Sequence, residues 1–159
     1  GKFCSRSLFQ WELLNTIHFL TIHLVITVCN DFTLTRFLWN MLGAQIETGA
    51  FVAASALVLG TDILKIGKGS FVDDQATVMG HTFQNGRLEM RPLNIGRNCE
   101  IGALSVILPG SEVGNEVRVH PLTQVMPGER LTNKSAYGGS PMEWLGHADR
   151  KLDDSYTLV

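Results

Sequence analysis

Several features are scarce in this chain of 159 residues, and their scarcity narrows what it can be. The three cysteines, Cys4, Cys29 and Cys99, are odd in number and have no CxxC spacing, which argues against a disulfide framework and a zinc ribbon. Charged residues make up only 18% and the net charge is −2, so there is neither a basic stripe nor an acidic tail. We therefore expect reduced thiols, no metal and no nucleic-acid partner.

The chain also has neither an initiator methionine nor a recognisable signal peptide. The chain begins Gly1-Lys2-Phe3 without an initiator methionine, so we expect it to be a piece of a longer protein. The apolar stretch 17–29 has no basic region before it and no small-residue cleavage site after it, unlike a signal peptide. We expect a cytoplasmic location, with the cytoplasmic face of a membrane as the more specific alternative. Composition and length suit one domain with an appendage.

The apolar stretch is shorter than the roughly 18 residues typical of a membrane-spanning helix. Leu13, Ile17, Leu20 and Leu24 fall on one face of a helix, which favours an amphipathic helix packed on a partner surface. The alternative is membrane association through residues 8–42. We assign residues 1–45 to an apolar helical segment and cap.

A repeat of six residues dominates the centre of the chain. Steps of six from one isoleucine meet only aliphatic residues: Ile95, Ile101, Ile107, Val113, Val119, Val125 and Leu131. Two earlier blocks keep the same period: Ile46, Val52 and Val58, then Ile66, Val72 and Val78. Shifts of frame separate the blocks around residues 61–64 and between residues 81 and 93. Such recurrence is the signature of a solenoid.

A period of six fits neither an α-helix nor an alternating hairpin sheet. It fits a three-sided prism in which each face is one short parallel strand and three hexapeptides make a coil. The position four residues after each aliphatic one is small in most repeats: Ala50, Ala56, Ser70, Ala76, Cys99, Ser105, Ser111 and Thr123. Glycines at corners, Gly67, Gly96, Gly102 and Gly114, relieve crowding by a β-carbon. About four coils are expected, over residues 46–136.

Both ends of a solenoid need covering, because open strand edges pair with other chains. The segment 37–42, before the first coil, is expected to form a helical cap. The segment 137–145, which contains Trp144, is expected to fold back over the last coil. Residues 137–159 are therefore assigned to a C-terminal cap and tail.

Three further motifs carry a resemblance. Gly80-His81 precedes a loop, Pro92-Leu93-Asn94-Ile95-Gly96 opens the next coil, and Gly139-Ser140-Pro141 follows the last one. In this order they resemble the hexapeptide-repeat acyltransferases, in particular the galactoside and xenobiotic acetyltransferases. The resemblance implies an all-β fold, a left-handed parallel β-helix, and a homotrimer or tandem β-helix contacts. It also implies transfer of an acyl group from a thioester donor to a small-molecule hydroxyl or amine.

The same resemblance suggests the site residues. His81 is the candidate general base, since imidazole titrates near neutral pH, and we expect it at a coil edge outside the packed interior. Backbone N–H groups near Gly102 and Ala103 are candidates to hold the oxyanion. The cofactor-binding candidates are Gly102, Ala103, Pro121, Gly139, Ser140 and Pro141. The donor would be acyl-CoA or a phosphopantetheine thioester.

A narrower resemblance joins two segments upstream. Residues 32–39 with 42–46, and residues 61–67, are similar to the terminal β-helix region of polylysine-synthetase-type nonribosomal peptide synthetases. Such regions follow adenylation and carrier domains and membrane-spanning helices. This resemblance implies a larger membrane-associated synthetase as the host of the chain.

Departures from the acetyltransferase pattern leave alternatives open. Where those enzymes carry a Thr-Lys pair and arginines for the coenzyme A phosphates, this chain has Met126-Pro127, Glu143 and Gly146. Their loss favours a carrier-bound donor, or a non-catalytic scaffold or oligomerisation domain. A third alternative is a γ-class carbonic anhydrase with three histidines on zinc, but His120 precedes a proline at a corner and the third ligand is missing within the coils.

Overall fold

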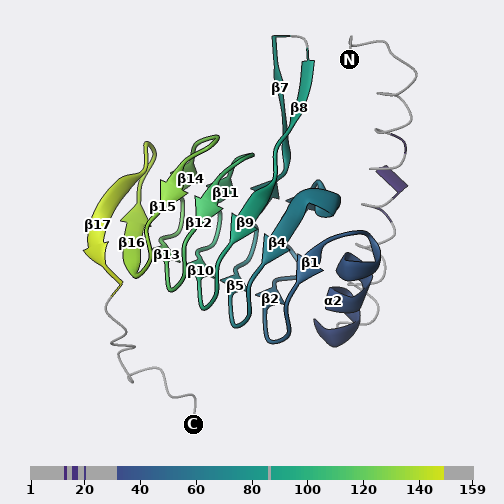
Figure 1. Cartoon of the computed structure of the whole chain (residues 1–159), viewed down its shortest axis with the longest axis horizontal. Helices are drawn as coiled ribbons and strands as arrows, with labels where there is room; N and C mark the ends of the chain where they lie inside the picture. The colour runs from purple at the N-terminus through teal and green to yellow at the C-terminus, as the bar shows by residue number, and fades with distance from the viewer. Residues whose placement is uncertain (1–12, 14–15, 18–19, 21–31, 86, 149–159) are drawn as a thin grey trace.

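A computed structural model describes residues 13, 16–17, 20, 32–85 and 87–148. They form a left-handed solenoid of short parallel strands, with helix α2 (Phe32–Met41) at one end and an antiparallel strand at the other (Figure 1). Three strands joined by three corners make a coil, and the strands of successive coils stack into three parallel sheets. The predicted fold class is confirmed.

The three sheets are the faces of the prism. Sheet A contains β1 (Gln45–Ile46), β4 (Leu64–Ile66), β9 (Leu93–Ile95), β12 (Glu112–Val113) and β15 (Arg130–Leu131). Sheet B contains β2 (Phe51–Val52), β5 (Phe71–Val72), β10 (Glu100–Ile101), β13 (Arg118–Val119), β16 (Ser135–Gly138) and β17 (Glu143–His147). Sheet C contains β3 (Leu57–Leu59), β6 (Thr77–Met79), β11 (Val106–Ile107) and β14 (Gln124–Val125). This gives four complete coils and the beginning of a fifth.

The corners form three edges, which we name by the sheets they join. The AB edge includes residues 47–50, 67–70, 96–99, 114–117 and 132–134. The BC edge includes residues 53–56, 73–76, 102–105, 120–123 and 139–141. The CA edge includes residues 60–63, 80–92, 108–111 and 126–129. One corner of the CA edge is expanded into a hairpin of β7 (His81–Gln84) and β8 (Arg87–Met90), which projects from the prism (Figure 1).

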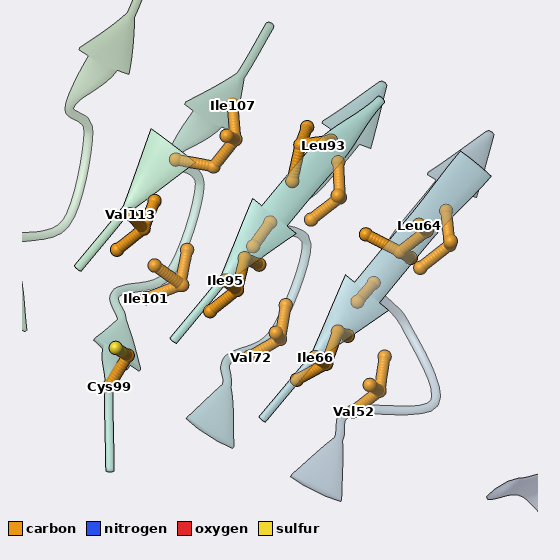
Figure 2. Close-up of a cluster of buried hydrophobic side chains, with 14 of the residues drawn as sticks. Val52, Leu64, Ile66, Val72, Leu93, Ile95, Cys99, Ile101, Ile107 and Val113 are labelled. Carbon is orange, nitrogen blue, oxygen red and sulfur yellow. The ribbon is translucent and has the colours of Figure 1, made fainter. Parts of the chain in front are cut away.

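The repeat aliphatics stack in register inside the prism (Figure 2). In sheet A, Val113 pairs with Ile95 on one side and with Leu131 on the other. In sheet B, Ile101 pairs with Val119. These are the two stacks that the six-residue spacing predicts, and all five side chains are buried. Each coil therefore buries its aliphatics against those of its neighbours.

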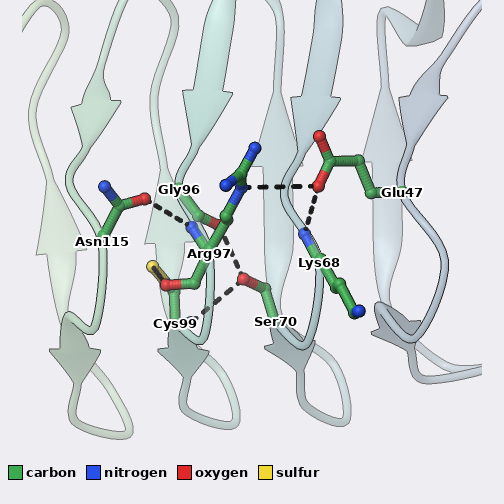
Figure 3. A network of polar contacts seen from close by, with 7 residues as sticks. All are labelled: Glu47, Lys68, Ser70, Gly96, Arg97, Cys99 and Asn115. Atoms are coloured by element: carbon green, nitrogen blue, oxygen red, sulfur yellow. Dashed lines mark hydrogen bonds and ion pairs between the residues drawn. The ribbon is translucent and has the colours of Figure 1, made fainter.

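The small residues at the corners are buried as predicted, except that Ala50 is only partly buried, and the hydroxyls of the serines join successive coils. Ser70 Oγ donates to the Gly96 carbonyl at 2.6 Å and accepts from the Cys99 N–H at 3.0 Å (Figure 3). Ser105 Oγ donates to the His120 carbonyl at 2.9 Å. A buried hydroxyl without such a partner would destabilise the interior, so these bonds explain why serine serves in place of alanine.

The corner glycines are needed for close approach. A β-carbon on Gly96 would lie 2.3 Å from the Gly114 carbonyl oxygen, and one on Gly102 would lie 2.6 Å from the Pro121 nitrogen. The left-handed backbone falls later in the corner, for example at Asn98 with φ 52° and at Leu104 with φ 59°. The predicted crowding at the corner glycines is therefore confirmed. The left-handed backbone conformation is adopted by other residues of the corner, such as Asn98 and Leu104.

Two features absorb the shifts of frame. The first is a short 3-10 helix, η1 (Thr61–Ile63), which follows Gly60 in a left-handed conformation with φ 82°. The second is the β7–β8 hairpin. At the N-terminal end, the Asn40 side chain on α2 accepts from the Ile46 N–H at 2.8 Å and donates to its carbonyl at 3.2 Å. The helix thereby occupies the open edge of β1, as a cap should.

At the other end, β17 folds back antiparallel onto β16. Trp144 lies in β17 but is 60% exposed, so it does not cover the last coil with its ring. Most of the apolar stretch 17–29 lies outside the described residues. Within the described part of the chain, no helix has the length and apolar character needed to cross a bilayer.

Candidate active site at the CA edge

His81 begins the β7–β8 hairpin, where the chain leaves sheet C. It pairs across the hairpin with Met90, and its ring meets Phe83 edge-on with 6.0 Å between centroids. The hairpin is closed at its base by the Arg91 N–H, which donates to the Gly80 carbonyl at 3.0 Å. The imidazole is thus held where a projecting arm joins the rigid solenoid.

The expectation that His81 lies outside the packed interior is wrong. The residue is only 5% exposed. Burial lowers the pKa of His81 below its usual value of 6.5, since desolvation disfavours the charged imidazolium. At neutral pH the ring is therefore uncharged, which is the state a general base requires.

An ion pair beside His81 was not singled out from the sequence. Arg91 Nη2 lies 2.9 Å from Glu89 Oε2, and both residues belong to the base of the hairpin. The Arg91 side chain also lies against Gly110 of the next coil, where a β-carbon would stand 3.1 Å from its Cδ. Nothing in the sequence distinguishes this arginine from other exposed ones, because its neighbours are set by the hairpin.

The other predicted site residues gather at the BC edge. Gly102 packs directly beneath Pro121, and the Gln124 N–H donates to the Gly139 carbonyl at 3.2 Å. Ser140 donates to the Gln124 side chain at 3.2 Å, and the Ser140–Pro141 peptide bond is cis. The structure thus brings all six cofactor-binding candidates to one edge.

The two candidate oxyanion donors differ in availability. The Gly102 N–H donates to the Val119 carbonyl at 2.8 Å as part of the ladder between coils. The Ala103 N–H makes no hydrogen bond with the residues that the structure describes. Of the pair, Ala103 is therefore the donor that a ligand can use.

His81 and Ala103 lie on different edges, with sheet C between them. Six residues of extended chain separate Gly102 from Leu108 across this sheet, at most about 20 Å. The outward side chains of sheet C, with Leu108 and Met126 at the first position of the CA edge, are mostly apolar: Leu57, Leu59, Thr77, Met79, Val106 and Gln124 are those on the strands. Leu104 and Leu122 extend this apolar face along the BC edge and are 50% and 67% exposed. Within one chain, the candidate base and the predicted cofactor residues do not share a site.

The described residues do not form the histidine metal site that was the third alternative. His120 is exposed at the BC edge. In the ranges that the structure covers, no three histidine, cysteine, aspartate or glutamate side chains come together as metal ligands within one chain. Two hollows open on the surface, one of about 310 Å³ against sheet B and one of about 600 Å³ against sheet A, and His81 lines neither.

Several solved structures with this architecture are acetyltransferases. A galactoside acetyltransferase in complex with coenzyme A aligns over 99% of this chain and 90% of its own, with a TM-score of 0.66 and 16% identity. A hexapeptide-repeat acetyltransferase from Vibrio cholerae aligns over 87% and 92%, with a TM-score of 0.64 and 14% identity. A maltose O-acetyltransferase from Clostridium difficile 630 aligns over 90% and 89%, with a TM-score of 0.63 and 15% identity. The chain therefore has the fold of the hexapeptide-repeat acetyltransferases.

A more particular likeness comes from sequence. The delta-poly-L-ornithine synthetase of Acinetobacter baumannii is 29% identical over 110 residues, or 69% of this chain. The chain spans only 8% of the length of that protein. No protein-family model matches the chain. The fold and the sequence likeness thus agree with the two resemblances that the motifs suggested.

Proposed function

We propose that this chain is an acyltransferase that moves an acyl group from a thioester to a hydroxyl or amine acceptor, with His81 as the general base. The acceptor atom attacks the thioester carbonyl while the imidazole removes its proton. The Ala103 N–H stabilises the negative charge on the carbonyl oxygen. The thiolate then leaves, and His81 returns the proton to it.

The observation that carries this proposal is the position of His81. It starts the hairpin of a solenoid whose structural neighbours are acetyltransferases, two of them described with coenzyme A or acetyl coenzyme A bound. The ring is neutral and fixed at the base of the arm, as a general base requires. Because it is 5% exposed, an acceptor reaches it by displacing a hairpin side chain such as Phe83.

A second copy of the chain completes the site. Three prisms packed in parallel around a threefold axis, each with sheet C toward the axis, place the CA edge of one copy beside the BC edge of the next. His81 of one copy then faces Ala103 of another. The apolar outward side chains of sheet C supply the surface that such packing would bury.

The donor is a phosphopantetheine thioester, either acyl-CoA or an acyl group on a carrier protein. The positions where acetyltransferases carry cations for coenzyme A are Pro127, Glu143 and Gly146 here, which favours the carrier. The named product of the Acinetobacter relative is a polymer of L-ornithine, whose assembly requires acylation of amines. This supports an amine acceptor and a host synthetase for this chain.

Membrane association belongs to the same proposal. Helix α2 carries exposed apolar side chains one turn apart, with Phe37 57% and Met41 69% exposed. Leu13, Ile17 and Leu20 are also about half exposed. These side chains suit the boundary of a lipid bilayer, at the cytoplasmic face of a membrane. Cosedimentation with vesicles should decrease in a Phe37→Ser/Met41→Ser variant and stay unchanged in Trp144→Ser.

The second candidate function is a scaffold without catalysis, and the loss of the phosphate-binding cations favours it. The two are separated by mixing the chain with acetyl-CoA or an acetylated carrier, plus amine and alcohol acceptors, and measuring the thiol released. Release that depends on acceptor, is lost in His81→Gln and is kept in His120→Gln supports the enzyme. No release with any donor, together with no binding of coenzyme A, supports the scaffold.

A further inference from the structure

The larger hollow, of about 600 Å³, lies against sheet A, mainly over its first three strands, and extends to Val113 of β12 and Asn115 at the AB edge. Its central side chains are Gln45 on β1, Lys65 on β4 and Asn94 on β9, which are direct neighbours in the parallel register. Gly67 and Gly96 line it toward the AB edge, where they have no side chain to fill the hollow. Three polar side chains on adjacent strands thus share one open depression.

The hollow has a net positive charge. Its one carboxylate, Glu47, already accepts from the Lys68 N–H at 2.9 Å and lies 3.7 Å from Arg97 Nε (Figure 3). Among the described residues Lys65 makes no ion pair. The Lys65 ammonium is therefore a positive charge that no carboxylate of the hollow neutralises. This positive charge favours an anionic ligand.

The hydrogen-bonding groups also suit an anion. The side chains of Gln45 and Asn94 make no hydrogen bond with the described part of the chain, so their amide N–H groups are available. An ammonium flanked by two amides offers several donors at the spacing of neighbouring strands, about 5 Å. Phosphate oxygens accept such donors in charge-assisted bonds.

The hollow and the base of the hairpin that holds His81 are linked by a short piece of chain. Asn94 follows Arg91 by three residues, at most about 10 Å of chain, and the Arg91 N–H is bonded to Gly80. An extended phosphopantetheine arm is about as long as four residues of extended chain, roughly 15 Å. A phosphate near Lys65 and a thioester near His81 are therefore within the reach of one arm.

We propose that the hollow on sheet A binds the phosphate group of the thioester donor, with Lys65 supplying the charge and Gln45 and Asn94 the additional hydrogen bonds. That the phosphate belongs to a pantetheine donor rests on the acyl transfer proposed above. The site would take over the role of the cations that this chain lacks at Pro127 and Glu143. It lies on a face of the prism that none of the predicted site residues occupies.

Calorimetry with the full chain tests the site without relying on activity. 4′-Phosphopantetheine should bind at least about tenfold more tightly than pantetheine, because only the former carries the charged group. Lys65→Gln should remove that difference. Lys68→Gln is the matched control, since this exposed lysine lies on the next corner and does not line the hollow. Equal affinity for the two ligands, or an unchanged difference in Lys65→Gln, overturns the proposal.

A second pair of variants guards against a change in folding. Asn94→Asp keeps the shape of the side chain but sets a negative charge beside Lys65, and should weaken phosphopantetheine binding about tenfold. Asn85→Asp is its control, since this exposed asparagine lies at the tip of the hairpin and does not line the hollow. Equal affinities in the two variants would contradict a phosphate in this hollow.

Transfer assays separate the two proposals and the two sources of the phosphate. If Lys65→Gln weakens phosphopantetheine binding but the unmutated chain transfers no acyl group, the phosphate site is supported and the acyl-transfer function is contradicted. If transfer occurs and Lys65→Gln leaves KM unchanged for both acetyl-CoA and an acetylated carrier, the phosphate site is contradicted and the acyl-transfer function is supported. A rise in KM for one donor alone identifies that donor as the source.

Discussion

His81 shows how the environment of one residue sets its chemistry. The residue is buried, so water stabilises the protonated form less than in solution, and the pKa falls below 6.5. The same burial gives the ring a structural role. Substitutions at this position therefore change both reactivity and packing, and the two effects require different variants.

Activity is best tested with a substitution that fills the same space. His81→Gln should lower the rate of acyl transfer by about 10²- to 10⁴-fold, the usual contribution of a positioned general base. His81→Ala removes buried atoms as well, and should cost about 1–3 kcal/mol of stability, or roughly 2–12 °C in Tm. Full transfer activity in purified His81→Gln would exclude the general-base role.

Stability should depend on pH through the same ring. The folded pKa is below the unfolded value of 6.5, so the unfolded state binds the proton more readily between the two values. Stability is then complete above pH 6.5 and falls as the pH decreases through the folded pKa. Thermal melts of the unmutated chain should show this loss, and His81→Gln should show a smaller one. Identical pH profiles would contradict the assigned shift.

At the scale of the element, the strands of this solenoid are too short to be stable alone. Most have two or three residues, and their stability comes from stacking on the equivalent strands of neighbouring coils. The interior is continuous along the prism, as the stacked aliphatics of Figure 2 show. A charge introduced anywhere in a stack therefore disturbs two interfaces at once.

Strand β12 allows a matched comparison of inside and outside. Val113 is 3% exposed between Ile95 and Leu131, so Val113→Asp buries a carboxylate without a partner and should cost at least about 3 kcal/mol. The preceding residue, Glu112, points outward and pairs with Arg130 at 3.1 Å, so Glu112→Gln should change stability by less than about 1 kcal/mol. Chemical denaturation of both variants checks the ranking, and the reverse order would contradict the assigned faces.

At the scale of the whole molecule, sheet C separates the candidate base from the candidate oxyanion donor. A rigid prism cannot bring two of its own edges together, because a closed stack of coils holds them apart. The chemistry proposed above therefore needs contact between copies. The apolar outer face of sheet C is where that contact is expected.

This expectation has a direct test in solution. Val106 lies in the middle of sheet C and faces outward, so Val106→Glu should convert a trimer into monomers and abolish acyl transfer together. Lys134→Glu is the control, since it lies at the AB edge with the same left-handed backbone that Glu116 already adopts. Sedimentation measures the assembly and circular dichroism the fold. A trimer that persists in Val106→Glu would overturn the packing on sheet C.

Much of the architecture could be predicted because the repeat is local. Six-residue spacing assigned Ile95, Val113 and Leu131 to one stack, and the small residues to buried corners, without any long-range information. The burial of His81 could not be predicted in this way, because it depends on the β7–β8 hairpin, which interrupts the repeat. The hollow around Lys65 was missed for a related reason. Its three central residues are 20 and 29 positions apart in sequence and become neighbours only through the winding.

The sequence by itself determined the period, the inward and outward faces, and the two points where the frame shifts. A hexapeptide repeat does this because each unit makes the same corner and buries the same side chain. Only the tertiary structure decided which edge each candidate occupies, since the edge depends on the residues inserted before it. The two extra residues at η1 and the length of the β7–β8 hairpin set that phase. They place His81 on the CA edge, apart from Ala103, and align Lys65 with Asn94.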